Sequence, residues 1–139
     1  MRALRESGLE ADPELVFEES PSIQGGYQVA QRIGSYKSKI SAIFAFSDVS
    51  AIGLIRGLHD IGLSVPADLS VVGFDDIFYS PFMIPSLTTI RQDIVSKGQI
   101  AVKMLLDQIN GTSSSIDKKS VKIPVSLAVR QSSAVYKEI

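Results

Sequence analysis

The sequence predicts an α/β fold in which a Rossmann-like parallel sheet is flanked by helices. Residues 40–76 carry this prediction, because two apolar runs, 42–46 and 71–74, stand on either side of a helical segment. Strands buried on both faces have continuous apolar runs, whereas half-exposed strands alternate apolar and polar residues. One βαβ unit with strands covered on both faces is therefore expected.

Polar residues follow both of these strands. Ser47 and Asp48 come after the first strand, and Asp75 and Asp76 come after the second. The carboxyl ends of neighbouring parallel strands open into a ligand crevice. Ser47, Asp48, Asp75 and Asp76 are therefore all candidate ligand contacts. Position alone leaves Asp75 open between ligand contact and a solvated strand end, whereas Asp48 is expected first as a helix N-cap and Asp76 as an exposed or capping residue.

Composition limits the possible functions. The chain has 139 residues, 45% of them hydrophobic, which suits one domain with a real core. Its 14 basic and 15 acidic residues leave no basic field for nucleic acid, so the chain itself is not expected to bind DNA. His59 is the single histidine and cysteine is absent, so neither a zinc site nor a cofactor is expected. No secretory or membrane-spanning run is visible, which favours a cytoplasmic location.

The first third of the chain is expected to hold two helices and one strand. A short helix at 1–7 ends at Gly8, a strand covers 15–17, and a second helix covers 23–33 between Ser22 and Gly34. Doubly wound folds begin with a strand, whereas this chain begins inside a helix. We therefore expect a fragment that lacks the opening strand of its sheet.

The helix after Asp48 has apolar residues at three-residue spacing and ends at Gly62. Its apolar surface is wider than one stripe, so a second subunit is expected to cover part of it. The loop 78–85 is rich in aromatic residues and bounded by prolines, a composition typical of interfaces. The remaining elements are expected as a strand at 87–90, a helix from Gln92 or Asp93 to Asn110, and strands at 121–125 and 127–129.

Several motifs in one order and spacing resemble the C-terminal part of LacI/GalR transcription regulators. The residues that carry the resemblance are Ala42 to Asp48, Ala51, Gly53, Gly62, Leu63, Val65, Pro66, Asp68, Ser70 to Asp76, Pro85, Leu87 to Ile90, Arg130 and Ser132. The resemblance implies a periplasmic-binding-protein-like domain of two lobes, with a sugar or similar small metabolite between them that changes operator binding. It implies that residues 1–139 are a partial effector-binding and dimerisation domain. The N-terminal helix-turn-helix and most of the first lobe would lie upstream, and the helix at 93–109 would belong to that first lobe.

The resemblance also implies roles for individual residues. Asp75 would accept hydrogen bonds from effector hydroxyl groups, and Ser47 would be a second polar contact. Gln92 and Ile94 would lie near the lobe crossover, where members of the family touch ligand. Pro21 stands near the position where the family often has an aromatic residue that stacks on the effector, and proline does not stack in that way. The homodimer contacts would fall at Ile52, Ile55, Met83 and Ile84.

Two other functions remain open at this point. A flavodoxin-like, magnesium-dependent phosphoacceptor or enzyme could use Asp48, Asp75 and Asp76 around the ion. Against catalysis, the sequence has no evident pair of nucleophile and base, so an enzyme is not expected. A periplasmic sugar-binding protein shares the fold, and its complete gene would carry an export signal rather than a helix-turn-helix.

Overall fold

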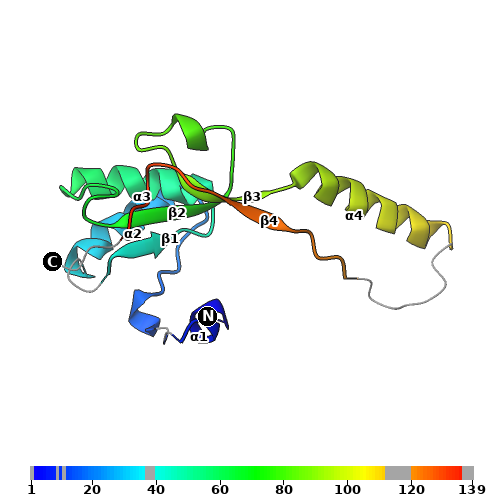
Figure 1. Cartoon of the computed structure of the whole chain (residues 1–139), viewed down its shortest axis with the longest axis horizontal. Coiled ribbons are helices and arrows are strands. Elements are labelled where there is room, and N and C mark those ends of the chain that lie inside the picture. The colour runs from blue at the N-terminus through cyan, green and yellow to red at the C-terminus, as the bar shows by residue number, and fades with distance from the viewer. Residues whose placement is uncertain (1, 9, 11, 37–39, 112–119, 136–139) are drawn as a thin grey trace.

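The computed structural model describes residues 2–8, 10, 12–36, 40–111 and 120–135. Within these ranges the chain forms an α/β structure with one sheet (Figure 1). The α-helices are α1 (Arg2–Glu6), α2 (Ile23–Ile33), α3 (Asp48–Asp60) and α4 (Ile94–Ile109), the strands are β1 (Ala42–Phe44), β2 (Ser70–Asp75), β3 (Thr88–Gln92) and β4 (Val125–Ala128), and the 3-10 turns are η1 (Pro13–Leu15), η2 (Gly34–Tyr36) and η3 (Ser80–Phe82).

The sheet has the strand order β1-β2-β3-β4. The pairs β1–β2 and β2–β3 are parallel, and β3–β4 is antiparallel. The predicted βαβ unit is confirmed, because α3 connects the parallel neighbours β1 and β2. The carboxyl ends of β1, β2 and β3 therefore lie at one edge of the sheet, where the β3–β4 ribbon runs out toward α4 (Figure 1).

Two strand predictions were wrong. The segment 15–17 forms no strand: Asp12 caps a 3-10 turn at Pro13–Leu15 by accepting a hydrogen bond from the Glu14 amide, and residues 16–20 pair with no described strand. At the other end, one strand, β4, replaces the two expected at 121–125 and 127–129. Hydrophobic β-branched residues favour extended backbone, but a strand also needs a neighbour to complete its hydrogen bonds.

The hydrophobic core lies between the sheet and the helices α2 and α3. The two helices approach closely because glycines face the partner backbone: a Cβ on Gly26 would lie 1.9 Å from the Ser50 carbonyl oxygen, and one on Gly53 would lie 1.8 Å from that of Ile23. The fully or nearly fully buried apolar residues are Ala30, Ile33, Ala45, Ala51, Leu54, Ile55, Leu58, Leu63, Leu69, Val71 and Leu87.

The opposite face of the sheet is open at β1, whereas on the same face Val72 of β2 is half-buried and Thr88 of β3 is buried. Phe44 and Phe46 of the β1 segment are 62% and 64% exposed. The expectation of strands covered on both faces therefore fails at β1, which is covered only on the face under α2 and α3. The continuous apolar run predicted the strand correctly, but it did not show whether both of its faces are covered.

Helix α4 extends away from the core, and none of its residues is buried (Figure 1). Asp93 is its N-cap, accepting a hydrogen bond from the Ser96 amide at 2.9 Å, and Asn110 is its C-cap, as expected. The exposed apolar residues of this helix are Ile94, Val95, Val102, Leu105, Leu106 and Ile109. No helix within the described ranges is long and apolar enough to span a membrane.

Candidate functional site

Asp75 and Gln92, both predicted as ligand contacts, lie together at the carboxyl edge of the sheet. Asp75 ends β2, and Gln92 ends the neighbouring strand β3. The Gln92 side-chain amide donates to Oδ1 of Asp75 at 2.7 Å, and the Lys97 ammonium donates to Oε1 of Gln92 at 3.3 Å. Within the described residues, no hydrogen bond to Oδ2 of Asp75 is recorded.

The backbone at the end of β2 has an unusual conformation. Asp75 has a φ of 119° and Asp76 a φ of 55°, and no other described residue apart from glycine has a positive φ. Such conformations cost on the order of 1–3 kcal/mol each and cluster at functional sites, where surrounding contacts hold them. Contacts with the rest of the fold must therefore stabilise this backbone conformation at the end of β2.

Among the predicted ligand contacts, only Gln92 has a recorded hydrogen bond to Asp75 in the described structure. Ser47 is 9% exposed and is the N-cap of α3, with its Oγ accepting from the Ser50 amide at 3.2 Å. This corrects the expectation that Asp48 would be the cap, since Asp48 is the first helical residue. Ile94 begins α4 and is 61% exposed, and Pro21 is exposed before α2. Neither of these two is joined to Asp75 by a contact that the described structure records.

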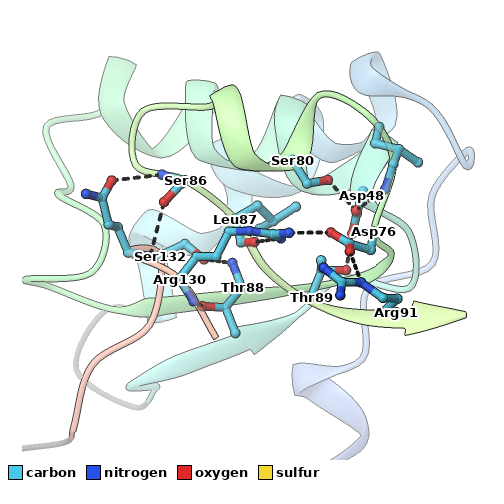
Figure 2. A network of polar contacts seen from close by, with 12 residues as sticks. Asp48, Asp76, Ser80, Ser86, Leu87, Thr88, Thr89, Arg91, Arg130 and Ser132 are labelled. Carbon is cyan, nitrogen blue, oxygen red and sulfur yellow. Dashed lines mark hydrogen bonds and ion pairs between the residues drawn. The ribbon is translucent and has the colours of Figure 1, made fainter. Parts of the chain in front are cut away.

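Asp76 is not exposed, contrary to expectation. Its side chain is 8% exposed and accepts hydrogen bonds from Arg91 of β3 and from Arg130 beyond β4, the latter at 2.7 Å (Figure 2). Although burial raises the pKa of Asp76, the two guanidinium groups lower it by more, so the net pKa lies below the ordinary value. Arg130 also donates to the Leu87 carbonyl at 2.7 Å. Asp76 thus links β3 to the segment directly after β4.

Asp48 forms a second polar cluster beneath the same edge. Its side chain is fully buried, and its oxygens accept hydrogen bonds from Ser80 and Thr89 hydroxyls, both at 2.5 Å, and from the Ile77 amide at 3.0 Å (Figure 2). Sequence analysis missed Ser80 and Thr89 as its partners, because they are 32 and 41 residues away in the chain.

The segment after β4 forms hydrogen bonds with the amino ends of β2 and β3. Ser132 is fully buried, donates from its Oγ to the Val71 carbonyl at 2.6 Å, and accepts from the Thr88 amide at 2.8 Å. The Ser132 amide donates to the Ser86 carbonyl at 2.9 Å. Figure 2 shows this serine next to Thr88, on the same side of the network as Arg130. Ser132 therefore completes hydrogen bonds of both strands where their direct pairing ends.

A pocket of about 490 Å³ lies where the β3–β4 ribbon leaves the sheet. Its lining residues are Arg91, Gln92, Asp93, Pro124, Val125 and Ser126. Because Gln92 also contacts Asp75, the pocket adjoins the carboxyl edge. The Arg91 guanidinium and the Asp93 carboxyl group in its lining are already hydrogen-bonded within the chain, to Asp76 and Ser96 respectively.

The predicted dimer residues fall into two groups. Ile55 is 7% exposed and packs in the core, and Ile52 and Met83 are half-buried. Ile84 is 95% exposed. It ends an aromatic loop, which we define as residues 78–84, whose exposed rings are Phe78, Tyr79 and Phe82.

The acidic residues do not assemble as a magnesium site. Asp48 is buried with three hydrogen bonds, and Asp76 is paired with two arginines. In the described part of the chain, no three His, Cys, Asp or Glu side chains are grouped so that they could hold a metal ion. The geometry therefore gives no support to the phosphoacceptor alternative.

Comparison with known proteins identifies the family. A family described as "Periplasmic binding protein-like domain" matches residues 1–133. The chain is 35% identical over 132 residues to the transcriptional repressor PurR of Haemophilus influenzae, and this match covers 94% of the chain and 39% of that protein.

Two solved structures show the same fold. A LacI family transcriptional regulator from Enterococcus faecium, solved with bound ribose, is 35% identical with a TM-score of 0.81, and the match covers 98% of this chain and 49% of that one. The lac repressor dimer bound to operator and the anti-inducer ONPF is 31% identical with a TM-score of 0.82, and the match covers 96% and 45% of the two chains.

The chain thus spans about two fifths of the length of the curated relatives it matches, and those relatives are transcription regulators rather than enzymes. The parallel sheet, the helices on it and the polar carboxyl edge all agree with that assignment. This chain belongs to the periplasmic binding protein-like domain family and corresponds to part of the effector-binding domain of LacI-type transcription regulators.

Proposed function

We propose that the carboxyl edge around Asp75 binds a sugar or similar small polyol and that this binding modulates operator DNA binding by the complete regulator. The observation that carries the proposal is the Asp75–Gln92 pair. Gln92 occupies Oδ1 of Asp75 and leaves Oδ2 without a partner in the described structure. A carboxyl oxygen held in this way can accept a hydrogen bond from a ligand hydroxyl.

The chemistry of the edge suits a hydroxylated ligand. Asp75 supplies acceptors, while Gln92 offers both an amide donor and a carbonyl acceptor, so neighbouring hydroxyl groups can be bound as donor and acceptor together. The bound ribose of the Enterococcus faecium relative supports this class of ligand. Ribose is accordingly the first ligand to test on this protein.

In this proposal the chain supplies one wall of a cleft between two lobes, and α4 belongs to the other lobe. Helix α4 carries six exposed apolar residues and no buried one, which suits a helix that completes a neighbouring core. The remainder of that lobe and a DNA-binding helix-turn-helix would be encoded upstream. A regulator of this kind acts in the cytoplasm, where its operator is.

We further propose that the protein is a homodimer through the aromatic loop and the neighbouring part of α3 near Ile52. Ile84 is 95% exposed, and the exposed ring of Phe78 contacts those of Tyr79 and Phe82. Exposed apolar groups gathered in this way are typical of interfaces. Met83 packs against the hydrophobic core, and Ile55 lies within it, so neither presents a large exposed surface to a partner. In sedimentation velocity, Ile84→Asp should give a monomer, whereas Val135→Asp, at a site 87% exposed outside the loop, should leave the dimer intact.

The main experiment is a thermal-shift measurement on the protein encoded by the complete gene, with D-ribose first and a panel of other monosaccharides and disaccharides next. A ligand that binds only the folded state stabilises it by about 2.7 kcal/mol at a concentration 100 times its Kd. Asp75→Ala should abolish the shift, and Glu10→Ala, which removes an exposed carboxyl group outside the proposed site, should retain it.

The same ligand should change the affinity of the complete protein for its operator, measured by fluorescence anisotropy. A shift that survives Asp75→Ala would show that the ligand binds elsewhere. The isolated 139-residue chain should bind the ligand weakly or not at all, because a cleft with one wall removed buries little of its ligand. Micromolar affinity of the isolated chain in calorimetry would contradict the two-lobe cleft.

A further inference from the structure

Asp48 joins three separate parts of the chain through one buried carboxyl group. Its Oδ2 accepts from the Ile77 amide at 3.0 Å and from the Ser80 hydroxyl at 2.5 Å, and its Oδ1 accepts from the Thr89 hydroxyl at 2.5 Å (Figure 2). Ile77 and Ser80 belong to the turn after β2, and Thr89 belongs to β3. The first residue of α3 therefore fixes the turn relative to the strand beside it.

The amide of Ile77 has a special position in the chain. It is the first amide after Asp75 and Asp76, the two residues with positive φ. A backbone conformation of this kind persists only where surrounding contacts hold the chain on both sides. On the incoming side Asp75 is held by pairing of β2 with β3, and on the outgoing side the chain is held by the bond from Ile77 to Asp48.

The turn beyond Ile77 is closed around the same carboxyl group. The Ser80 amide donates to the Ile77 carbonyl at 3.0 Å, and the Leu87 amide donates to the Ser80 carbonyl at 2.9 Å. Ser80 is fully buried. Beneath Asp48, β2 carries Gly73, where a Cβ would lie 2.2 Å from Oδ1 of Asp48. The sheet thus leaves the space that this side chain needs.

We propose that Asp48 is a positioning residue for the effector-binding carboxyl group. Asp48 does not touch the ligand. It holds the chain directly beyond Asp75 and Asp76, and this restraint sets the direction in which the Asp75 side chain leaves β2. The ligand-binding part of this inference rests on the proposed function, whereas the restraint of the turn is independent of it.

Two variants of Asp48 distinguish the loss of its hydrogen bonds from a change of charge at constant side-chain shape. Asp48→Ala removes all three bonds, leaving the Ile77 amide and two buried hydroxyls without their acceptor. Asp48→Asn keeps the shape: its amide oxygen can accept from Ile77 and Ser80, while its NH₂ group can donate to the Thr89 hydroxyl. The control is Leu58→Ala, which leaves a cavity in the core at a fully buried site of the same helix and touches none of these bonds.

Amide hydrogen exchange on the protein encoded by the complete gene tests the restraint directly. In Asp48→Ala, amides of residues 75–80 should exchange about tenfold faster or more than in Leu58→Ala, since a lost buried hydrogen bond commonly changes an equilibrium by that factor. Asp48→Asn should restore most of the protection. If Asp48→Ala does not fold, Ser80→Ala should show the same local effect with a smaller factor. Equal exchange of 75–80 in these variants and in Leu58→Ala would overturn the proposal.

Calorimetry with D-ribose tests the consequence for binding. Asp48→Ala should bind D-ribose about tenfold more weakly or worse, Asp48→Asn should recover, and Leu58→Ala should bind like the wild type when folded. Faster exchange of 75–80 with unchanged D-ribose affinity would overturn the positioning role. Absence of D-ribose binding by the wild type would count against the proposed ligand, and the exchange experiment would then decide the restraint by itself.

Discussion

The substitution Gly73→Ala tests whether the carboxyl group of Asp48 occupies space that only a glycine leaves free. An added Cβ would lie 2.2 Å from Oδ1 of Asp48 and 2.9 Å from Cδ2 of Leu87, whereas ordinary contacts begin at 3.4 Å. The carboxyl group would have to move by about 1.2 Å to reach that distance. Such a movement breaks its hydrogen bond to Thr89, since Oδ1 is the atom that accepts it.

The expected magnitude follows from three effects. Overpacking of a filled core costs about 1–3 kcal/mol. Loss of a buried hydrogen bond costs about 1–3 kcal/mol. Alanine restricts the unfolded chain more than glycine does and recovers about 0.4–1 kcal/mol. Gly73→Ala should therefore lower the free energy of unfolding by about 3 kcal/mol, within a range of about 1–6 kcal/mol.

Urea denaturation of the protein encoded by the complete gene, followed by circular dichroism, measures this change. Gly98→Ala is the matched control, because a Cβ there meets no atom within 4 Å, and alanine is the better helix former. In an Asp48→Ala background, the cost of Gly73→Ala should fall by about 1 kcal/mol or more, since the clashing oxygen is gone. A Gly73→Ala protein as stable as the wild type, or a cost unchanged by Asp48→Ala, would refute this explanation.

Three further predictions concern the contacts of the C-terminal segment. Arg130→Ala should lower the free energy of unfolding by about 3 kcal/mol, because Arg130 is 15% exposed and pairs with a buried carboxylate. Arg91→Ala should lower it by less than about 1 kcal/mol, because the Arg91 side chain is 59% exposed. Urea denaturation measures both changes. The lowered pKa of Asp76 stabilises the fold at pH above its unfolded-state pKa of about 4, and this contribution is lost as pH falls through the folded-state pKa. The acid-induced loss of stability below about pH 4 should therefore be smaller in Asp76→Asn, and an identical slope would contradict the pairing. Ser132→Ala should cost about 1–3 kcal/mol because it leaves a buried amide and a buried carbonyl without their partner, and near-neutral stability would show that water replaces the hydroxyl.

Local sequence signals predicted most of the helices correctly. Ser22 caps α2 by accepting from the Gly25 amide at 3.0 Å, and Asp93 caps α4. Gly8 and Gly62 end their helices with φ values of 74° and 80°. These signals act over three or four residues, so the sequence displays them directly. His59 stands between apolar and acidic residues of α3 and is exposed, because helical periodicity does not fix which intermediate face meets the core.

Long-range contacts decided what the sequence left open at the site. The positions of Ser47 and Asp75 at the ends of neighbouring parallel strands followed from the apolar runs. The same pattern assigned the wrong roles to Asp48 and Asp76. A carboxyl group after a strand can cap a helix, pair with an arginine or bind a ligand, and the partners that choose among these lie far along the chain.

The sequence by itself determined the βαβ unit with its parallel strands and most of the helix ends, because hydrophobic periodicity and capping are local properties of the chain. Only the tertiary structure decided that Asp76 joins Arg91 and Arg130, and that Asp48 is buried beneath the turn after β2. It also showed that segment 15–17 has no strand partner in the described ranges. The physical reason is that hydrogen bonds and ion pairs depend on which distant segments come within about 3 Å of one another, and the folded chain alone brings them there.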